Sequence, residues 1–86
     1  MKDSLTQIYN RSCLDDFLMK ELERLRRYKR PFCVIMFDID NFKNINDTYG
    51  HDKGDLLLKN ISKIVKQNIR ISDVLFRLGG DEFMVI

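Results

Sequence analysis

The chain has 86 residues, of which 44% are hydrophobic and 33% are charged, a composition typical of one small globular domain. Its net charge of +2 lacks the basic excess of a nucleic-acid-binding protein, so we expect no nucleic-acid partner. No apolar run is long enough to cross a bilayer and no secretory signal is recognisable, which favours a cytoplasmic location with no direct membrane contact in this segment. A full-length protein anchored in a membrane is compatible with this. Cys13 and Cys33 lack metal-ligand spacing, and we expect both to be buried, reduced thiols.

The first predicted element is a helix over Leu14–Tyr28, because its apolar residues recur at helical spacing. Ser12 is the expected N-cap, and Pro31 is expected to end the element. The following run, Phe32–Asp38, is short and rich in β-forming residues. It predicts a strand that is buried on both faces.

The middle of the chain predicts two helical stretches. Phe42–Tyr49 places three apolar residues on one helical face, and Gly50 is the expected C-cap. The pattern breaks over residues 51–54, and we expect the helix to resume at Asp55 with an apolar stripe of its own.

The last part of the chain predicts a hairpin. A second strand over Asp73–Leu78 is followed by a Gly79–Gly80 turn and a third strand over Glu82–Ile86. Helices with one apolar stripe must cover a sheet, so this order of elements indicates an α/β layer. The sequence resembles the first half of a larger domain. We expect the third strand to have an open hydrophobic edge that promotes pairing with a second copy.

Acidic residues follow the first strand and the hairpin turn. If the first and third strands are neighbours, one of Asp38 and Asp40 can meet Asp81 at one edge of the sheet. Such a carboxylate pair suits Mg²⁺, which usually takes one or two carboxylates plus substrate phosphates. The alternative is that these acids only occupy turns, where Asp is common, and bind no metal.

Three motifs resemble those of the GGDEF domains, the diguanylate cyclases. "GGDEF" itself spans Gly79–Phe83, and "DSLTQIYNR" is similar to an N-terminal D-x-L-T-x-L-x-N-R motif, with Ile8 in place of leucine. "FDIDNFKNINDTYGHDKGD" matches the long central string of the family. Together, in the right order, they span nearly the whole chain and are far more specific than any one of them.

The resemblance implies an α/β (α+β) fold, a ferredoxin-like palm like that of nucleotide polymerases and adenylate cyclases, truncated after the GGDEF hairpin. It implies a bacterial signalling enzyme, a nucleotidyltransferase that condenses two GTP molecules into cyclic di-GMP and releases pyrophosphate. Because each domain of the family holds one GTP, it also implies a homodimer.

By motif position, the resemblance implies that Asp38, Asp81 and the main-chain oxygen of Ile39 bind Mg²⁺, or Mn²⁺ in its place. Glu82 would assist at a second metal, so Asp38, Asp81 and Glu82 form the implied catalytic set. Gly79 and Gly80 would let the backbone approach the phosphates without a Cβ in the way.

The resemblance also implies a guanine site made by Asn46 and Asp55. A carboxylate at Asp55 can accept hydrogen bonds from guanine that adenine does not offer. Without the resemblance, Asn46 reads as a helix-surface residue and Asp55 as a helix N-cap. His51 would lie near the same nucleotide, and its role is left open.

"RISD", Arg70 to Asp73, stands where the family carries an inhibitory R-x-x-D site for cyclic di-GMP. Arg70 can fork onto a phosphate or a guanine edge, and Asp73 can accept from guanine. The alternative is a local Arg–Asp pair at the end of a helix.

The chain departs from the family in length. Residues 1–86 would be the N-terminal half of the domain, without the later segment that supplies basic phosphate-binding residues. We therefore expect the complete domain to be active and the 86-residue piece by itself to be inactive or severely impaired. Two other hypotheses stay open: a module that binds GTP or cyclic di-GMP without catalysis, and a structural half-domain that assembles with itself.

Overall fold

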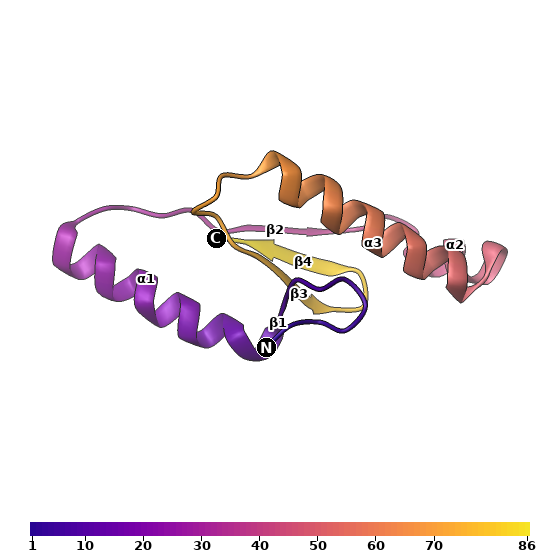
Figure 1. Cartoon of the computed structure of the whole chain (residues 1–86), viewed down its shortest axis with the longest axis horizontal. Helices are drawn as coiled ribbons and strands as arrows, with labels where there is room; N and C mark the ends of the chain where they lie inside the picture. The colour runs from indigo at the N-terminus through magenta and orange to yellow at the C-terminus, as the bar shows by residue number, and fades with distance from the viewer.

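The computed structural model describes residues 1–86 and confirms a mixed α/β architecture (Figure 1). A four-stranded sheet has the strand order β1-β3-β4-β2, in which β1 runs parallel to β3 and the other neighbours are antiparallel. In chain order the elements are β1 (Tyr9–Asn10), the 3₁₀ helix η1 (Arg11–Cys13), α1 (Leu14–Tyr28), β2 (Ile35–Asp38), α2 (Phe42–Tyr49), α3 (His51–Asn68), β3 (Leu75–Gly79) and β4 (Glu82–Val85).

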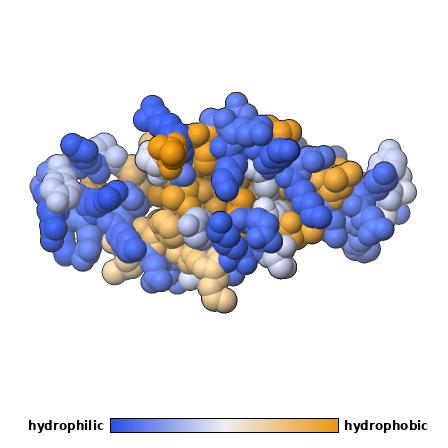
Figure 2. All heavy atoms as spheres, in the orientation of Figure 1, coloured by the Kyte–Doolittle hydropathy of each residue, from blue (hydrophilic) through white to orange (hydrophobic).

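The two faces of the sheet carry separate apolar clusters, because neighbouring residues of a strand point to opposite faces. Helix α3 covers one face, where Leu58 packs with Phe83. The start of α1 covers the other, where Leu14 packs with Phe76. Both phenylalanines are fully buried. Figure 2 shows the hydrophobic residues gathered over the middle of the molecule, with hydrophilic ones at both ends.

The prediction of a strand buried on both faces over Phe32–Asp38 is wrong. The strand β2 is shorter, Ile35–Asp38, and its Ile35 and Met36 are 58% and 61% exposed. It lies at the edge of the sheet and pairs only with β4. The expected open edge on the last strand is wrong for the same reason, since β4 lies between β3 and β2 and its Phe83, Met84 and Val85 are buried.

Helix α1 has the predicted bounds but not the predicted cap. Ser12 lies inside η1, and its backbone N–H donates to the side chain of Asn10 at 3.0 Å, so Asn10 is the capping residue there. The helix ends before Pro31 is reached: Lys29 adopts a left-handed conformation, and its N–H donates to the carbonyl of Leu25.

Helix α3 begins at His51 rather than at the predicted Asp55. Gly50 caps α2 as expected, and its φ of 90° makes the corner, after which the next helix starts at once. Asp55 is therefore inside α3, and its alternative reading as an N-cap is wrong.

The hairpin turn is displaced by one residue from the prediction. Gly79 is the last residue of β3 and pairs with Glu82, so the turn consists of Gly80 and Asp81. The register shifts between Arg77 and Gly79, which marks an irregularity of the β-bulge type. This shift places Asp81 in the turn itself.

The expected burial of the cysteines is also wrong. Cys33 is exposed in the segment before β2, and Cys13 is half-buried in η1. Both are free thiols, as expected. No helix of the structure combines the length and the apolar character that a membrane crossing requires.

Candidate functional site

One end of the sheet carries three acidic residues. Asp38 ends β2, and its Cα partner on β4 is Glu82. Asp81 precedes Glu82 in the turn. The first and third predicted strands are therefore neighbours, and the structure confirms that premise of the sequence analysis. Acids from segments more than forty residues apart lie at one edge.

These carboxylates have no positive side chain to neutralise them. The ion pairs in the structure are Arg24–Glu21 and Arg77–Asp3, and no side-chain hydrogen bond involves Asp38, Asp81 or Glu82. Like charges held near one another are unfavourable unless a cation joins them. The arrangement fits a divalent cation on this ground.

The donor set fits Mg²⁺ better than a metal that needs a closed protein cage. No group of three or more His, Cys, Asp or Glu side chains is gathered closely enough to hold an ion by itself. Mg²⁺ does not require one, since it keeps waters and takes ligands from substrate phosphates. The side chain of Ile39 packs against the apolar cluster under α3. Its main-chain oxygen is therefore the group of this residue that can act as a metal ligand.

The corner between α2 and α3 brings together two predicted guanine-binding residues, Asn46 on α2 and Asp55 on α3. Asn46 is half-buried, and its side-chain Oδ1 is buried without a hydrogen-bond partner. It lies against Gly54, where an added Cβ would come within 1.7 Å of that oxygen. Asp55 follows Gly54 directly and is exposed.

This corner stands beyond the same end of the sheet as the carboxylates (Figure 1). Three residues, 39 to 41, connect Asp38 to the start of α2. His51, the first residue of α3, is exposed, and its side chain forms no hydrogen bond or ion pair with the other predicted site residues. A nucleotide that spans the carboxylates and the corner is compatible with this placement.

The segment Arg70–Asp73 forms a closed turn after α3. The carboxylate of Asp73 accepts from the backbone N–H of Arg70 at 2.9 Å, and the N–H of Asp73 donates to the carbonyl of Arg70 at 3.0 Å. The guanidinium of Arg70 makes no ion pair with Asp73, and the two residues are joined locally through the backbone N–H of Arg70 instead. The exposed guanidinium is free to contact a ligand.

A second polar connection was missed by the sequence analysis. Arg77 of β3 forms an ion pair with Asp3, with 3.0 Å between Nη1 and Oδ2, and it donates two hydrogen bonds to the carbonyl of Gly80. The sequence does contain a signal for this ion pair, since Arg77 lies inside the apolar run of a predicted strand. An unpaired charge buried there would be unfavourable, so a partner for Arg77 could have been predicted.

The pKa of Asp3 reflects this connection. Partial burial by itself raises the pKa, but hydrogen bonds from the hydroxyl and the N–H of Thr6, together with the Arg77 guanidinium, outweigh it. The net pKa lies below the ordinary value of an aspartate. The ionised carboxylate is therefore favoured in the folded protein.

Acidification is expected to remove the stability that this carboxylate contributes. A lowered folded-state pKa contributes fully above the unfolded value of about 3.9 and is lost as the pH falls through the folded value. The free energy of unfolding of Asp3→Asn should differ most from wild type near neutral pH and converge with it below about pH 4. Denaturant unfolding across a pH series measures this, and a constant difference down to pH 2 would contradict it.

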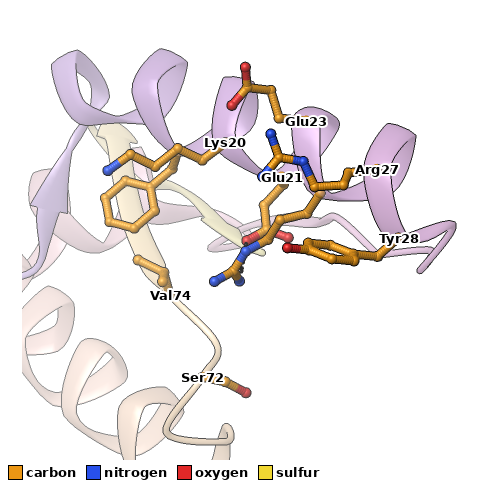
Figure 3. A pocket seen from close by; sticks show the side chains of 9 residues that line it. Lys20, Glu21, Glu23, Arg27, Tyr28, Ser72 and Val74 are labelled. Atoms are coloured by element: carbon orange, nitrogen blue, oxygen red, sulfur yellow. Dashed lines mark ion pairs between the residues drawn. The ribbon is translucent and has the colours of Figure 1, made fainter.

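A hollow elsewhere on the surface does not belong to this site. Figure 3 shows it between α1, with Lys20 and Arg27, and the segment that carries Ser72 and Val74. Val74 immediately precedes β3, whereas the Gly80–Asp81 turn follows the other end of that strand. The hollow and the carboxylates are therefore at opposite ends of the sheet.

Comparisons with known proteins identify the family of this chain. Residues 1–86 match the family described as "Diguanylate cyclase, GGDEF domain". The chain is 43% identical, over its whole length, to the bifunctional diguanylate cyclase/cyclic di-GMP phosphodiesterase MucR of Pseudomonas aeruginosa. It spans 13% of that protein.

Solved structures of GGDEF domains superpose closely. The GGDEF domain of TpbB, also called YfiN, of Pseudomonas aeruginosa has a TM-score of 0.94 at 40% identity, and the match covers 99% of this chain and 49% of that one. The GGDEF domain of DgcB of Caulobacter crescentus, solved in complex with c-di-GMP, has a TM-score of 0.92 at 31% identity, with 98% and 48% covered. This chain thus spans about half of each solved domain. A family match over every residue, joined to a shared fold, shows that the chain belongs to the GGDEF family of diguanylate cyclase domains.

Proposed function

We propose that the full-length protein that contains this chain is a diguanylate cyclase, which condenses two GTP molecules into cyclic di-GMP. The observation that carries the proposal is the pairing of Asp38 with Glu82, beside the Gly80–Asp81 turn, at one end of the sheet. In each half-reaction the 3′-oxygen of one GTP forms a bond to the α-phosphorus of the other. The bond from that phosphorus to the β-phosphate oxygen breaks, and pyrophosphate leaves.

The carboxylates of Asp38 and Asp81 and the main-chain oxygen of Ile39 would hold Mg²⁺ or Mn²⁺, with Glu82 near a second ion. A metal there would lower the pKa of the attacking hydroxyl and neutralise charge on the phosphates. Gly79 and Gly80 present backbone without a Cβ beside the same turn, with nothing within 4 Å of where one would stand. Phosphate oxygens can therefore approach the main chain closely.

Guanine would be bound at the corner between α2 and α3. The exposed carboxylate of Asp55 is an acceptor for the N1 and N2 hydrogens of guanine. Asn46 lies beside Gly54, the residue before Asp55, and its amide would be the second polar group for the base. His51 would stand beside the nucleotide, and we assign it no role in binding.

The test is synthesis of cyclic di-GMP by the purified full-length protein. With GTP and Mg²⁺, mass spectrometry should detect cyclic di-GMP and pyrophosphate. Because each domain would hold one GTP, two copies must meet, so the specific activity should fall when the protein is diluted. Binding of cyclic di-GMP without any turnover, in Mg²⁺ or Mn²⁺, would instead favour a non-catalytic binding module. We expect residues 1–86 alone to be inactive.

We further propose that the product inhibits the enzyme through Arg70 and Asp73. The free guanidinium of Arg70 supports this, since it is exposed and joins no ion pair. Arg70→Ala should raise the inhibition constant for cyclic di-GMP by roughly tenfold or more, because a charge-assisted hydrogen bond contributes about 1.5–3 kcal/mol. The measurement is the ratio of rates with and without added product. The neighbouring Ser72→Ala is the matched control, and equal inhibition of both variants would contradict the assignment.

A further inference from the structure

Arg77 connects two segments that lie at opposite ends of the sequence. Its Nη1 donates to both carboxylate oxygens of Asp3, at 3.1 and 3.0 Å. Its Nε and Nη2 donate to the carbonyl oxygen of Gly80, at 3.0 and 2.9 Å. The side chains of Arg77 and Asp3 are 15% and 20% exposed, so solvent screens this pair less than a surface ion pair.

The carbonyl that Arg77 holds belongs to the peptide unit that leads into Asp81. A peptide unit is planar, so fixing the direction of the Gly80 carbonyl also fixes the N–H and the Cα of Asp81. This constraint matters here because Gly80 has a φ of 50° and glycine resists rotation less than other residues. Two donors on one carbonyl restrain a turn that would otherwise be free to rotate.

Asp3, at the other end of the connection, is itself held in place. Its Oδ2 accepts from the N–H of Thr6 at 2.8 Å and from the Thr6 hydroxyl at 2.7 Å. Its carbonyl accepts from the N–H of Gln7, and its N–H donates to the carbonyl of Ile8. Gln7 has a φ of 62°, which few non-glycine residues adopt, so the turn is closely determined. Arg77 is therefore anchored to a rigid turn.

We propose that Arg77 is a positioning residue for the proposed cyclase reaction, with Asp3 as its anchor: together they set the orientation of the Gly80–Asp81 peptide and so the placement of the Asp81 carboxylate. This inference rests on the proposed function for its role in catalysis. An ion pair that served stability alone would need Asp3 and Arg77 but no hydrogen bonds to the turn. The guanidinium instead donates two hydrogen bonds to the carbonyl of Gly80, the residue before Asp81.

Three graded variants of the full-length protein test this. Thr6→Val removes one bond to Asp3, Asp3→Asn removes the charge pair, and Arg77→Lys keeps the charge but loses the planar fork. We expect the kcat per folded molecule to fall in that order, reaching about tenfold or more for Arg77→Lys, because small misplacements of a reacting group are costly. The KM for GTP should change less than kcat, and the concentration of Mg²⁺ at half-maximal rate should rise.

Two readouts separate positioning from stability. NMR order parameters of the Gly80 and Asp81 amides should decrease in the same order, and the affinity for Mn²⁺ alone, measured by electron paramagnetic resonance, should fall. Circular dichroism of each sample gives the folded fraction by which the rates are divided. Glu21→Gln is the matched control, because it breaks the other ion pair, at 3.7 Å between Glu21 and Arg24, far from the turn. It should change none of these quantities.

The outcomes decide the proposal in each case. Unchanged kcat, Mn²⁺ affinity and order parameters of the Gly80 and Asp81 amides in folded Asp3→Asn and Arg77→Lys would overturn it. Losses of activity that vanish once the folded fraction is considered would also overturn it. If the wild-type protein makes no cyclic di-GMP, the proposed function fails, whereas the amide order parameters and Mn²⁺ affinity still test the positioning of Asp81. If a variant does not fold, Thr6→Val, which leaves both charges in place, decides by the same two measurements.

Discussion

Asp38→Asn and Asp81→Asn should each abolish the synthesis of cyclic di-GMP by the full-length protein. Asparagine keeps the shape of the side chain but removes the charge that a divalent cation requires. Electrostatic stabilisation of a transition state by a single group contributes about 10²–10³ in rate, and loss of a metal is expected to cost at least this much. The measurement is initial rate against Mg²⁺ concentration, with folding checked by circular dichroism.

Asp40→Asn is the matched control for this prediction. Asp40 is also exposed and stands two residues after Asp38, beyond the end of β2. The register of the sheet pairs Asp38, not Asp40, with Glu82 on β4. We therefore expect the Asp40 variant to keep most of its activity. Loss of activity in the Asp40 variant alone would indicate that Asp40, rather than Asp38, binds the metal.

Asp38→Asn should also raise the free energy of unfolding when no metal is present, as denaturant unfolding would measure. Asp38 and Glu82 are opposite each other on neighbouring strands and have no ion-pair partner, and like charges in directly opposite positions are unfavourable. A functional site that is held at a cost to stability commonly behaves in this way. The opposite signs of the two effects would distinguish a site from a structural cluster.

Local patterns were sufficient for two of the three α-helices of this fold. The apolar spacing predicts α1 over Leu14–Tyr28 and α2 over Phe42–Tyr49, which are the observed bounds. Periodicity depends on residues within one or two turns, so a single segment contains all the information it needs. The same reasoning fails at Asp55, because the helix continues through Gly54, whose missing Cβ makes room for Asn46.

The order of the strands depends on contacts that no local pattern reports. An apolar run such as the one ending at Asp38 reads alike for a central strand and for an edge strand, and here it belongs to the edge. The short strand Tyr9–Asn10 has too few residues to show any alternation. The convergence of Asp38 with the turn was predictable only as a consequence of assumed strand neighbours, which the register confirms.

The ion pair between Asp3 and Arg77 was the feature of the site that was hardest to predict from the sequence. Seventy-four positions separate the two residues, and neither spacing nor composition pairs them. The register shift after Arg77, which puts Asp81 into the turn, likewise arises from packing in three dimensions. Long-range polar contacts and bulges are therefore the parts of this site that required a structure.

Base selectivity is the other large effect that we expect. Asp55→Ala should weaken the binding of GTP by roughly ten- to a hundredfold, because a hydrogen bond to a charged group contributes about 1.5–3 kcal/mol. The binding of ATP should change little, since adenine lacks the N1 and N2 hydrogens that a carboxylate would accept. Competition of unlabelled GTP and ATP against a fluorescent guanine nucleotide measures both affinities in one assay.

Asp52→Ala is the matched control for the Asp55 variant. Asp52 is an exposed aspartate one turn earlier on α3, and both residues line the same shallow hollow, so the two substitutions remove equal charge from one surface. A non-specific electrostatic effect would raise the affinity of both variants for any nucleotide. A loss for GTP in the Asp55 variant alone would therefore identify a hydrogen bond to the base. Equal losses for GTP and ATP would show that Asp55 supports the helix rather than guanine.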